Sequence, residues 1–235
     1  MTDHFQQIYN NRADRYELLI SREDYAGNLL PALNQIRSLA GLDVVEMGAG
    51  TGRLTRLLAP VVKRIRAFDA AQAMLNIAAL KLSELGLENW ALQVAEHKAL
   101  PVEDGSADLA LAGWTFGHIP TWYPEDWQAE LDRILAEMQR VLKPDGTIII
   151  IETMGTGFET PRPPTQNLAG YFAYLADRHG FTGTTIRTDY KFESHQEAVT
   201  LIRFFFGDDL AEKVVANQWA IVPECTGIWW RHYKT

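Results

Sequence analysis

The order of polar and apolar residues predicts an α/β fold in which helices cover both faces of a mostly parallel sheet. Short apolar strands alternate with helical periodicity over residues 42–153, which is the pattern of repeated strand–helix units. A glycine-rich turn at 46–52 joins the first strand of this series to its helix. The stretch 147–152 is almost entirely apolar, as expected for a strand in the middle of a sheet buried on both faces.

The repeating part contains five predicted strands, at 42–47, 64–68, 90–94, 107–113 and 147–152. Helices are expected between them, at 52–60, 70–85 and 124–142, where apolar residues recur every three or four positions. Asp-Gly pairs mark turns at 103–106 and 143–146. We therefore assign residues 42–153 as the core of the fold.

Two further parts flank this core. Residues 1–41 are expected to form helices at 4–20 and 24–40, the second opened by a capping box, S-x-x-D, at 21–24. Residues 154–235 begin with an irregular segment at 154–165. Helices are then expected at 166–179, 194–206 and 209–216, and strands at 184–192 and 226–233, with a second capping box at 194–197. Because no repeat or low-complexity linker is present, we expect one domain.

Composition limits the possible functions. The 235 residues suffice for one α/β domain with a sizeable core. A net charge of −8 and a pI near 5.3 argue against a general affinity for nucleic acid. The single cysteine, Cys225, excludes an intrachain disulfide and a multi-cysteine zinc site, and it is consistent with a reducing cytoplasm. No signal segment is evident and the apolar runs are too short to span a bilayer, so we expect a cytoplasmic protein without membrane contact.

The turn at 46–52 has the chemistry of a nucleotide-like cofactor site. Gly48, Gly50 and Gly52 permit positive φ and remove side chains where a ligand would approach the backbone. The helix N-terminus behind the turn offers N–H groups and a partial positive charge. The dinucleotide fingerprint requires its third glycine at the position that Arg53 occupies here. Glu46 would repel a pyrophosphate but suits an ammonium group. A tight turn without a ligand is the alternative.

This E-x-G-x-G-x-G pattern resembles motif I of the class I S-adenosylmethionine-dependent methyltransferases, in the type 11 (UbiE-like) small-molecule group. Asp69, then Glu96-His97 ahead of Leu100-Pro101, then the string V-L-K-P-D-G at 141–146 follow in the order typical of that family. The resemblance covers about residues 40–155. It implies a Rossmann-like sheet of seven strands, mostly parallel with an antiparallel last strand. It also implies S-adenosyl-L-methionine as cofactor and S-adenosyl-L-homocysteine as product.

The candidate cofactor residues follow from spacing and from this resemblance. Asp69 stands about twenty residues beyond the turn, where an acid binds ribose hydroxyls; capping the next helix is its alternative role. The resemblance assigns the adenine amino group to Glu96 and a ring nitrogen to the N–H of His97, against the alternative of an ordinary surface loop. Met74 suits an adenine face or simple core packing. The predicted set is Glu46, Gly48, Ala49, Gly50, Gly52, Asp69, Ala70, Met74, Glu96, His97 and Trp114.

The acceptor is expected beyond the strand at 107–113, because ligands of open parallel sheets bind outside the carboxyl ends of strands. Trp114 and Phe116 would wall the pocket there, and His118 is the candidate catalytic base, or else a structural hydrogen-bonding residue. In the resembled family, N-terminal helices such as those expected in residues 1–41 fold over the pocket. The candidate lid residues are Tyr9 and Tyr16, with Arg12 and Arg15. The alternative is that the helix at 4–20 only packs on the sheet. The segment 154–165 is a candidate lid.

The implied reaction is in-line methyl transfer to an O, N, S or C atom of a small-molecule acceptor. A base is needed only if the acceptor arrives protonated. No carboxylate cluster follows the strand at 107–113, so we expect no metal. Pro163-Pro164 is not an Asn/Asp-Pro-Pro-aromatic motif, which argues against amino methylation of DNA bases. We expect a monomer or homodimer. The alternatives are a nicotinamide-dependent oxidoreductase and a cofactor-binding protein without turnover.

Overall fold

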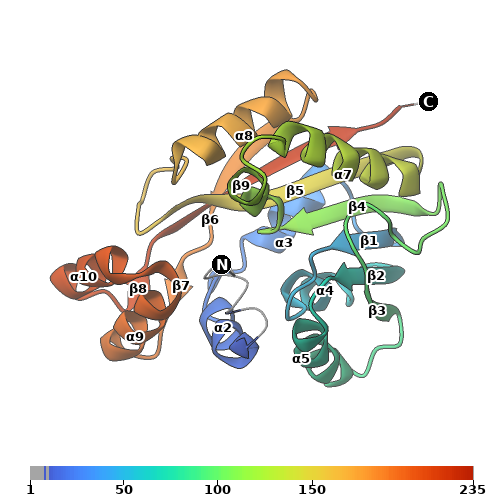
Figure 1. Ribbon diagram of the computed structural model, residues 1–235. Coiled ribbons are helices and arrows are strands. Elements are labelled where there is room, and N and C mark those ends of the chain that lie inside the picture. Colours follow the sequence, from blue (N-terminus) through green and yellow to red (C-terminus); the bar gives the residue numbers. More distant parts are fainter. Residues whose placement is uncertain (1–7, 9–10, 235) are drawn as a thin grey trace.

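The computed structural model describes residue 8 and residues 11–234. At its centre lies a seven-stranded sheet with the order β3-β2-β1-β4-β5-β9-β6 (Figure 1). Neighbouring strands run parallel except at β9, which is antiparallel to both β5 and β6. The predicted fold class is confirmed. The strands are β1 (Asp43–Met47), β2 (Arg64–Asp69), β3 (Trp90–Val94), β4 (Ala107–Gly113), β5 (Leu142–Thr156), β6 (Thr182–Arg187) and β9 (Glu224–His232).

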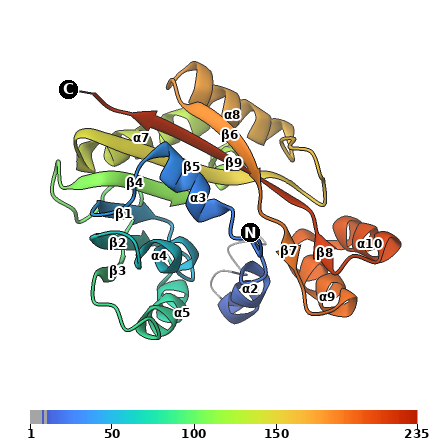
Figure 2. The same ribbon diagram turned by 180° about the vertical axis from the view of Figure 1, so that it is seen from behind.

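Helices cover both faces of this sheet (Figures 1 and 2). Ile148 and Ile150 of β5 join one buried cluster with α7 (Trp127–Val141) and α8 (Gln166–Asp177). Ile149 and Ile151 join a second cluster with α3 (Leu29–Ile36) and α4 (Arg53–Leu58). Successive side chains of a strand point to opposite faces, so a strand covered on both sides must be apolar at every position.

The strand order places a crevice at the carboxyl end of β1. From β1 the chain builds outward through β2 and β3 on one side, with α5 (Gln72–Ser83) between them, and through β4 and β5 on the other. The order therefore reverses between β1 and β4. In open parallel sheets such a reversal leaves a gap between the flanking loops, and ligands bind in it.

The chain after β4 differs from the prediction. Instead of a helix from residue 124, a short 3₁₀ turn, η1 (Phe116–His118), leads into a one-turn helix, α6 (Ile119–Trp122), and α7 starts only at Trp127. Glu152 of β5 accepts the backbone N–H of Gly117 at 2.9 Å. His118 therefore lies in a helical turn fixed to the end of β5, not in an open loop.

The turn expected at 143–146 is a bulge inside β5. The pairing with β4 shifts register between Ala107 and Leu109, and Asp145 adopts a φ of 62°. Lys143, within the bulge, donates to Asp43 and Asp108 at 3.0 and 2.9 Å. Because the strand is paired on both sides of the Asp-Gly sequence, the chain accommodates it as a bulge and does not turn back.

The predicted strand at 184–192 is wrong as a single element. β6 ends at Arg187, and Tyr190–Lys191 form β7 of a separate two-stranded sheet with β8 (Ile221–Val222). Between them the Asp189 carboxylate accepts the N–H of Glu224 at 2.9 Å, which bends the chain out of the main sheet. β7 and β8, with α9 (His195–Phe206) and α10 (Asp208–Asn217), form a small cap with its own buried cluster. The capping box that opens α9 is confirmed, because Ser194 Oγ accepts the N–H of Glu197 at 3.1 Å.

The N-terminal part also departs from the prediction. α2 (Ala13–Ile20) lies between the core and the cap, and the second helix, α3, starts at Leu29 and not at residue 24. The capping box at 21–24 is wrong: Ser21 donates its hydroxyl to the carbonyl of Leu18 at 2.8 Å. Asp24 instead accepts the N–H groups of Asn28 and Leu29, at 2.8 and 3.1 Å.

Candidate functional site

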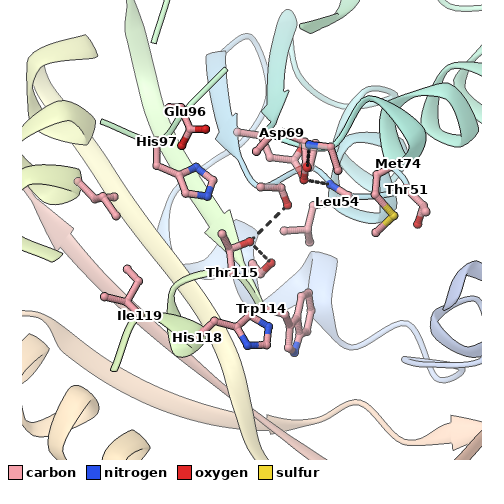
Figure 3. Close-up of a pocket in the computed structure, with 18 of the residues that line it drawn as sticks. Thr51, Leu54, Asp69, Met74, Glu96, His97, Trp114, Thr115, His118 and Ile119 are labelled. Carbon is pink, nitrogen blue, oxygen red and sulfur yellow. Dashed lines mark hydrogen bonds between the residues drawn. The ribbon is translucent and has the colours of Figure 1, made fainter. Parts of the chain in front are cut away.

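A cavity of about 470 Å³ lies at the carboxyl ends of β1, β2 and β4. Glu46 at β1, Asp69 at β2 and Glu96 after β3 all line it, so the three acids singled out in the sequence share one cavity. Figure 3 shows Glu96 and His97 at one end of the drawn residues, and Trp114 and His118 at another. Pockets of this volume are typical of small-molecule and cofactor sites.

The three glycines of the turn all have left-handed φ, but for different packing reasons. A Cβ on Gly48 would overlap the side chain of Thr115, and one on Gly52 would come within 3.0 Å of the Ala78 Cβ on α5. A Cβ on Gly50 would meet only the Met74 methyl group, at 3.7 Å. Gly48 and Gly50 both line the cavity, and of the two only Gly50 has no packing obstacle to a side chain, whereas Gly52 packs against α5 and does not line the cavity.

Asp69 holds the turn in place. Its two carboxylate oxygens accept the N–H of Gly50 and of Ala71, each at 2.8 Å (Figure 3). The N–H groups of Ala49 and Gly52 are bonded to the carbonyls of Phe68 and Ala49. The expectation that the turn offers bare N–H groups is therefore wrong for these three amides. Each Asp69 oxygen keeps a second lone pair, which suits hydroxyl donors better than a phosphate.

Glu46 is almost fully buried at the bottom of the cavity, with an exposed fraction of 1%. Thr55 on α4 donates its hydroxyl to Glu46 at 2.6 Å. Burial raises the pKa of Glu46 to about 8, against the Thr55 hydrogen bond, and the charge of Asp69 raises it further. Without a cation beside it, Glu46 is therefore largely protonated at neutral pH. A ligand cation beside it would reverse that balance by favouring the carboxylate.

His97 and Glu96 form the far end of the cavity. The His97 ring lies edge-on to Phe116, with centroids 5.5 Å apart, and its buried Nδ1 has no hydrogen-bond partner among the described residues. Burial lowers the pKa of His97, so its ring is neutral. Phe116 itself is fully buried behind His97 and does not line the cavity, contrary to the expectation that it walls the pocket.

Trp114, Tyr16 and His118 surround the other end of the cavity. Trp114 adopts a φ of 52°, and its N–H donates to the carbonyl of Ile151 at 2.7 Å. His118 stacks on Trp122, with centroids 4.9 Å apart. Non-glycine residues with such φ values are held there by their surroundings, and they cluster at ligand sites.

Several predicted site residues line the cavity, and others do not. Tyr9 lies outside the described residues. The segment 154–165 is absent from the lining. The N–H of Gly157 donates to the carbonyl of Pro223, just before β9, and the N–H of Arg162 donates to the carbonyl of Met154 within the same segment, each at 2.7 Å. The predicted residues found in the lining are Glu46, Gly48, Ala49, Gly50, Asp69, Ala70, Met74, Glu96, His97, Trp114, Tyr16 and His118.

The sequence analysis missed other lining residues. Thr51 and Thr115 stand beside motif positions and could have been found from that neighbourhood. Arg53 was considered only as a missing glycine. The remaining lining residues were not predicted as site residues: Ile20, Leu54, Ala71, Lys98, Gly113, Ile119, Trp122, Tyr123, Glu130 and Ile134.

The described residues contain neither a candidate metal centre nor a candidate membrane-spanning helix. No group of three or more His, Cys, Asp or Glu side chains in residues 11–234 or at residue 8 is arranged to hold a metal ion. In the same part of the chain, every helix is too short or too polar to cross a bilayer.

Comparison with known proteins finds similarity to methyltransferases. A family model described as a methyltransferase domain matches residues 45–150. The demethylmenaquinone methyltransferase of Lactococcus lactis is 29% identical over 154 residues, which are 63% of this chain and 58% of the relative. These similarities support the class I methyltransferase family that the sequence resembles. The ubiquinone/menaquinone biosynthesis C-methyltransferase of Hahella chejuensis is also 29% identical, over 64% of this chain and 56% of that protein. The chain thus spans less than two thirds of the length of these two relatives.

Solved structures of class I methyltransferases have the same fold. A SAM-dependent methyltransferase from Aquifex aeolicus superimposes with a TM-score of 0.57 at 16% identity, covering 97% of this chain and 98% of that one. Phosphoethanolamine N-methyltransferase 2 from Haemonchus contortus, solved with S-adenosyl-L-methionine, gives 0.61 at 14% identity, covering 100% of this chain and 61% of that one. These structures confirm the Rossmann-like fold expected from the sequence.

Proposed function

We propose that this chain transfers a methyl group from S-adenosylmethionine to a small-molecule acceptor and releases S-adenosylhomocysteine. The observation that carries the proposal is the convergence of Glu46, Asp69 and Glu96 on one cavity. Neighbouring parallel strands bring the three carboxylates to the same edge of the sheet, so one acid is available to each of the amino acid, sugar and base of one cofactor.

Each acid has a distinct task in this proposal. Glu46 takes the ammonium group, because a buried and mostly protonated carboxyl gains most from a cation. Asp69 accepts the ribose hydroxyls with the lone pairs that the turn leaves open. Glu96 and His97 bind the adenine edge, and the unpartnered Nδ1 of His97 is consistent with a polar ligand at that end. Met74 and the backbone of Gly50 pack against the nucleoside.

When bound, the cofactor supplies an electrophilic methyl group on a positively charged sulfur. The chain's own work is then to align the acceptor and to exclude water. Tyr16 and Trp114 close the cavity on the acceptor side. His118 lines the same cavity, and its role is to accept a proton if the acceptor is protonated. We keep His118 as the candidate base. Burial raises the pKa of Tyr16 above its ordinary range, so its hydroxyl stays neutral.

Charge separates this proposal from a nicotinamide-dependent oxidoreductase. The amides of Ala49, Gly50 and Gly52 are already bonded within the protein. A pyrophosphate would therefore meet the acids of the cavity without the amide cradle that the dinucleotide fold provides.

Two observations narrow the class of acceptor: the side chains that line the cavity and the names of the similar proteins. Aromatic side chains, including Trp114 and the stacked pair His118–Trp122, suit a planar acceptor. Because two relatives are named for the methylation of menaquinone or ubiquinone precursors, reduced quinones are the first acceptors to test. We also propose a cytoplasmic location and a monomeric or homodimeric state. The proposed division of the domain is an N-terminal helical lid (1–41), a cofactor-binding core (42–153) and a substrate-side part with the C-terminal edge strands (154–235).

Isothermal titration calorimetry tests the proposal. S-adenosylhomocysteine should bind the purified protein and NAD should not. Asp69→Ala should weaken S-adenosylhomocysteine binding by about 1.5–3 kcal/mol, because hydrogen bonds to a carboxylate are lost. The matched control is Glu84→Ala, since Glu84 is an exposed acid at the end of α5 and does not line the cavity. Binding of NAD alone would overturn the proposal. Unchanged affinity in Asp69→Ala would remove Asp69 from the site.

A further inference from the structure

Arg53 joins three parts of the chain at one point. It begins α4 directly after the glycine turn, and its Nη1 donates to Glu23, in the turn between α2 and α3, at 2.6 Å. Its guanidinium carbon lies 3.7 Å from the centre of the Trp114 ring. Glu23 in turn accepts the hydroxyl of Thr188, near the cap, at 3.2 Å. The core, the turn between α2 and α3, and the segment that leads into the cap therefore meet around the Arg53 guanidinium.

The ion pair of Arg53 and Glu23 is buried. The side chains are 18% and 2% exposed. Arg53 remains a cation at any physiological pH, and Glu23 neutralises it through one of its nitrogens only. The other nitrogen, Nη2, is buried and has no hydrogen-bond partner among the described residues. A buried donor without an acceptor is unfavourable, and native structures seldom keep one unless another molecule satisfies it.

Arg53 stands at the acceptor end of the cavity, and this placement rests on the proposed function. If Glu46, Asp69 and Glu96 hold the amino acid, sugar and base in that order, the sulfur and its methyl group lie between the amino acid at Glu46 and the sugar at Asp69. The acceptor is then expected beside β4, the neighbour of β1 on the side away from β2. Arg53, Tyr16 and Trp114 line the same cavity, and Trp114, on whose ring Arg53 stacks, directly follows β4. Arg53 and Ile20 also border a second hollow of about 340 Å³, so they form the wall between the two.

We propose that Arg53 selects the methyl acceptor by donating its unpaired Nη2 to an oxygen atom of that acceptor that carries full or partial negative charge. The class is carboxylates and hydroxylated or carbonyl-bearing aromatic molecules, stacked beside Trp114. Amines are disfavoured, because a guanidinium offers only donors and repels an ammonium. Glu23 acts as a positioning residue: it fixes one edge of the guanidinium so that the other edge faces a single direction.

Calorimetry on protein saturated with S-adenosylhomocysteine tests this proposal. The probes are four molecules of one shape: 1-naphthoate, 1-naphthol, 1-aminonaphthalene and naphthalene. We expect the wild-type protein to bind 1-naphthoate and 1-naphthol at least about tenfold more tightly than the other two, from one hydrogen bond to a charged donor. Arg53→Met should abolish this preference while leaving the affinity for S-adenosylhomocysteine within about threefold. In Glu23→Gln the affinity for 1-naphthoate should rise, because the guanidinium is no longer neutralised.

The matched control is Arg56→Met, one turn further along α4. Arg56 borders only the second hollow, so its loss should leave the preference intact. Arg53→Met leaves Glu23 as an unpaired buried charge and threatens folding. The double variant Glu23→Gln/Arg53→Met removes both charges and should show the same loss of preference in a folded protein.

The outcomes separate this inference from the proposed function. If S-adenosylhomocysteine fails to bind, the proposed function fails, and this inference falls with it. If it binds but the four probes bind the wild-type protein equally, or not at all, the inference alone is overturned. A preference that survives in the double variant also overturns it, and means that an internal water is the partner of Nη2.

Discussion

At the scale of single residues, the site is shaped by polar groups that the fold has removed from water. Glu46 is the clearest case. The glycine motif marks Glu46 as a site residue, but it does not report that burial at the tip of β1 moves the pKa of this carboxyl to about 8. At neutral pH the Glu46 carboxyl is therefore mostly in its neutral form, and it ionises when a cation binds beside it.

This coupling predicts that cofactor affinity depends on pH. Between pH 6 and 7.5 the affinity for S-adenosylhomocysteine should increase, because binding an ammonium beside Glu46 requires the carboxylate and releases a proton. The release approaches one proton per bound ligand, so the affinity rises by at most about tenfold per pH unit. Calorimetry in buffers with different ionisation enthalpies measures the released proton. Glu46→Gln should bind more weakly and show no such release; an unaltered pH profile in this variant would contradict the assignment.

The glycines of the turn give a second prediction at this scale. Gly50→Ala places a methyl group beside Met74 at the cavity and should weaken cofactor binding, with a loss of stability of about 1–2 kcal/mol from its φ of 55°. Gly52→Ala has the same backbone problem and also presses on Ala78, so it should lose more stability. Urea unfolding and calorimetry on both variants separate the two effects. Equal losses of stability would contradict the packing role of Gly52.

At the scale of elements, helix starts are set by which groups the tertiary structure leaves available. Both S-x-x-D/E sequences, at 21–24 and 194–197, have the local signature of a cap. Only Ser194 forms one. At the other, Arg22 pairs with Glu193 and Glu197 of the cap, and Glu23 pairs with Arg53, so the chain there is held in a turn by long-range ion pairs.

The two serines therefore form a matched pair for mutation. Ser194→Ala should reduce the free energy of unfolding by about 1 kcal/mol, because the N–H of Glu197 loses its acceptor. Ser21→Ala should change it by less than about 0.5 kcal/mol, because its hydroxyl only donates to a carbonyl at the end of α2. Chemical denaturation of both variants measures the difference. A larger loss for Ser21→Ala would restore the predicted capping box.

At the scale of the whole molecule, buried carboxyls make stability depend on pH. Glu46, Glu152 and Glu224 each have a pKa of about 8, in every case chiefly because burial disfavours the charged form. Between about pH 4.5 and pH 8 the folded protein holds protons that the unfolded chain has released. Stability is therefore greatest at the acidic end of this window and falls as pH rises through it.

Glu152→Gln should reduce this dependence. One such carboxyl contributes a slope of about 1.4 kcal/mol per pH unit within the window, and the glutamine contributes none. Urea unfolding at several pH values between 5.5 and 8.5 gives the slopes of both proteins. Glu197→Gln is the control, because the pKa of Glu197 is lowered and its contribution lies below this range. Identical slopes in the wild-type protein and Glu152→Gln would show that Glu152 is charged in the folded state.

The sequence alone determined the parts of this protein that rest on short-range pattern. Alternating strands and helices gave the α/β class, and 90–94 and 107–113 were predicted with the bounds that the structure has. The spacing of Glu46, the glycines and Asp69 gave the cofactor side of the cavity, because a turn and the acid that follows it lie on adjacent strands.

Only the tertiary structure decided the acceptor side and the cap. Arg53 meets Glu23 and Trp114 across distances in sequence that no local pattern reports. Phe116 is in the core and His118 is in a helical turn because Glu152, from another strand, binds the N–H of Gly117. β6 and β7 separate after Arg187 because Asp189 accepts the N–H of Glu224. Contacts between distant segments, and the burial that shifts pKa values, arise only once the chain is packed, so sequence periodicity carries no record of them.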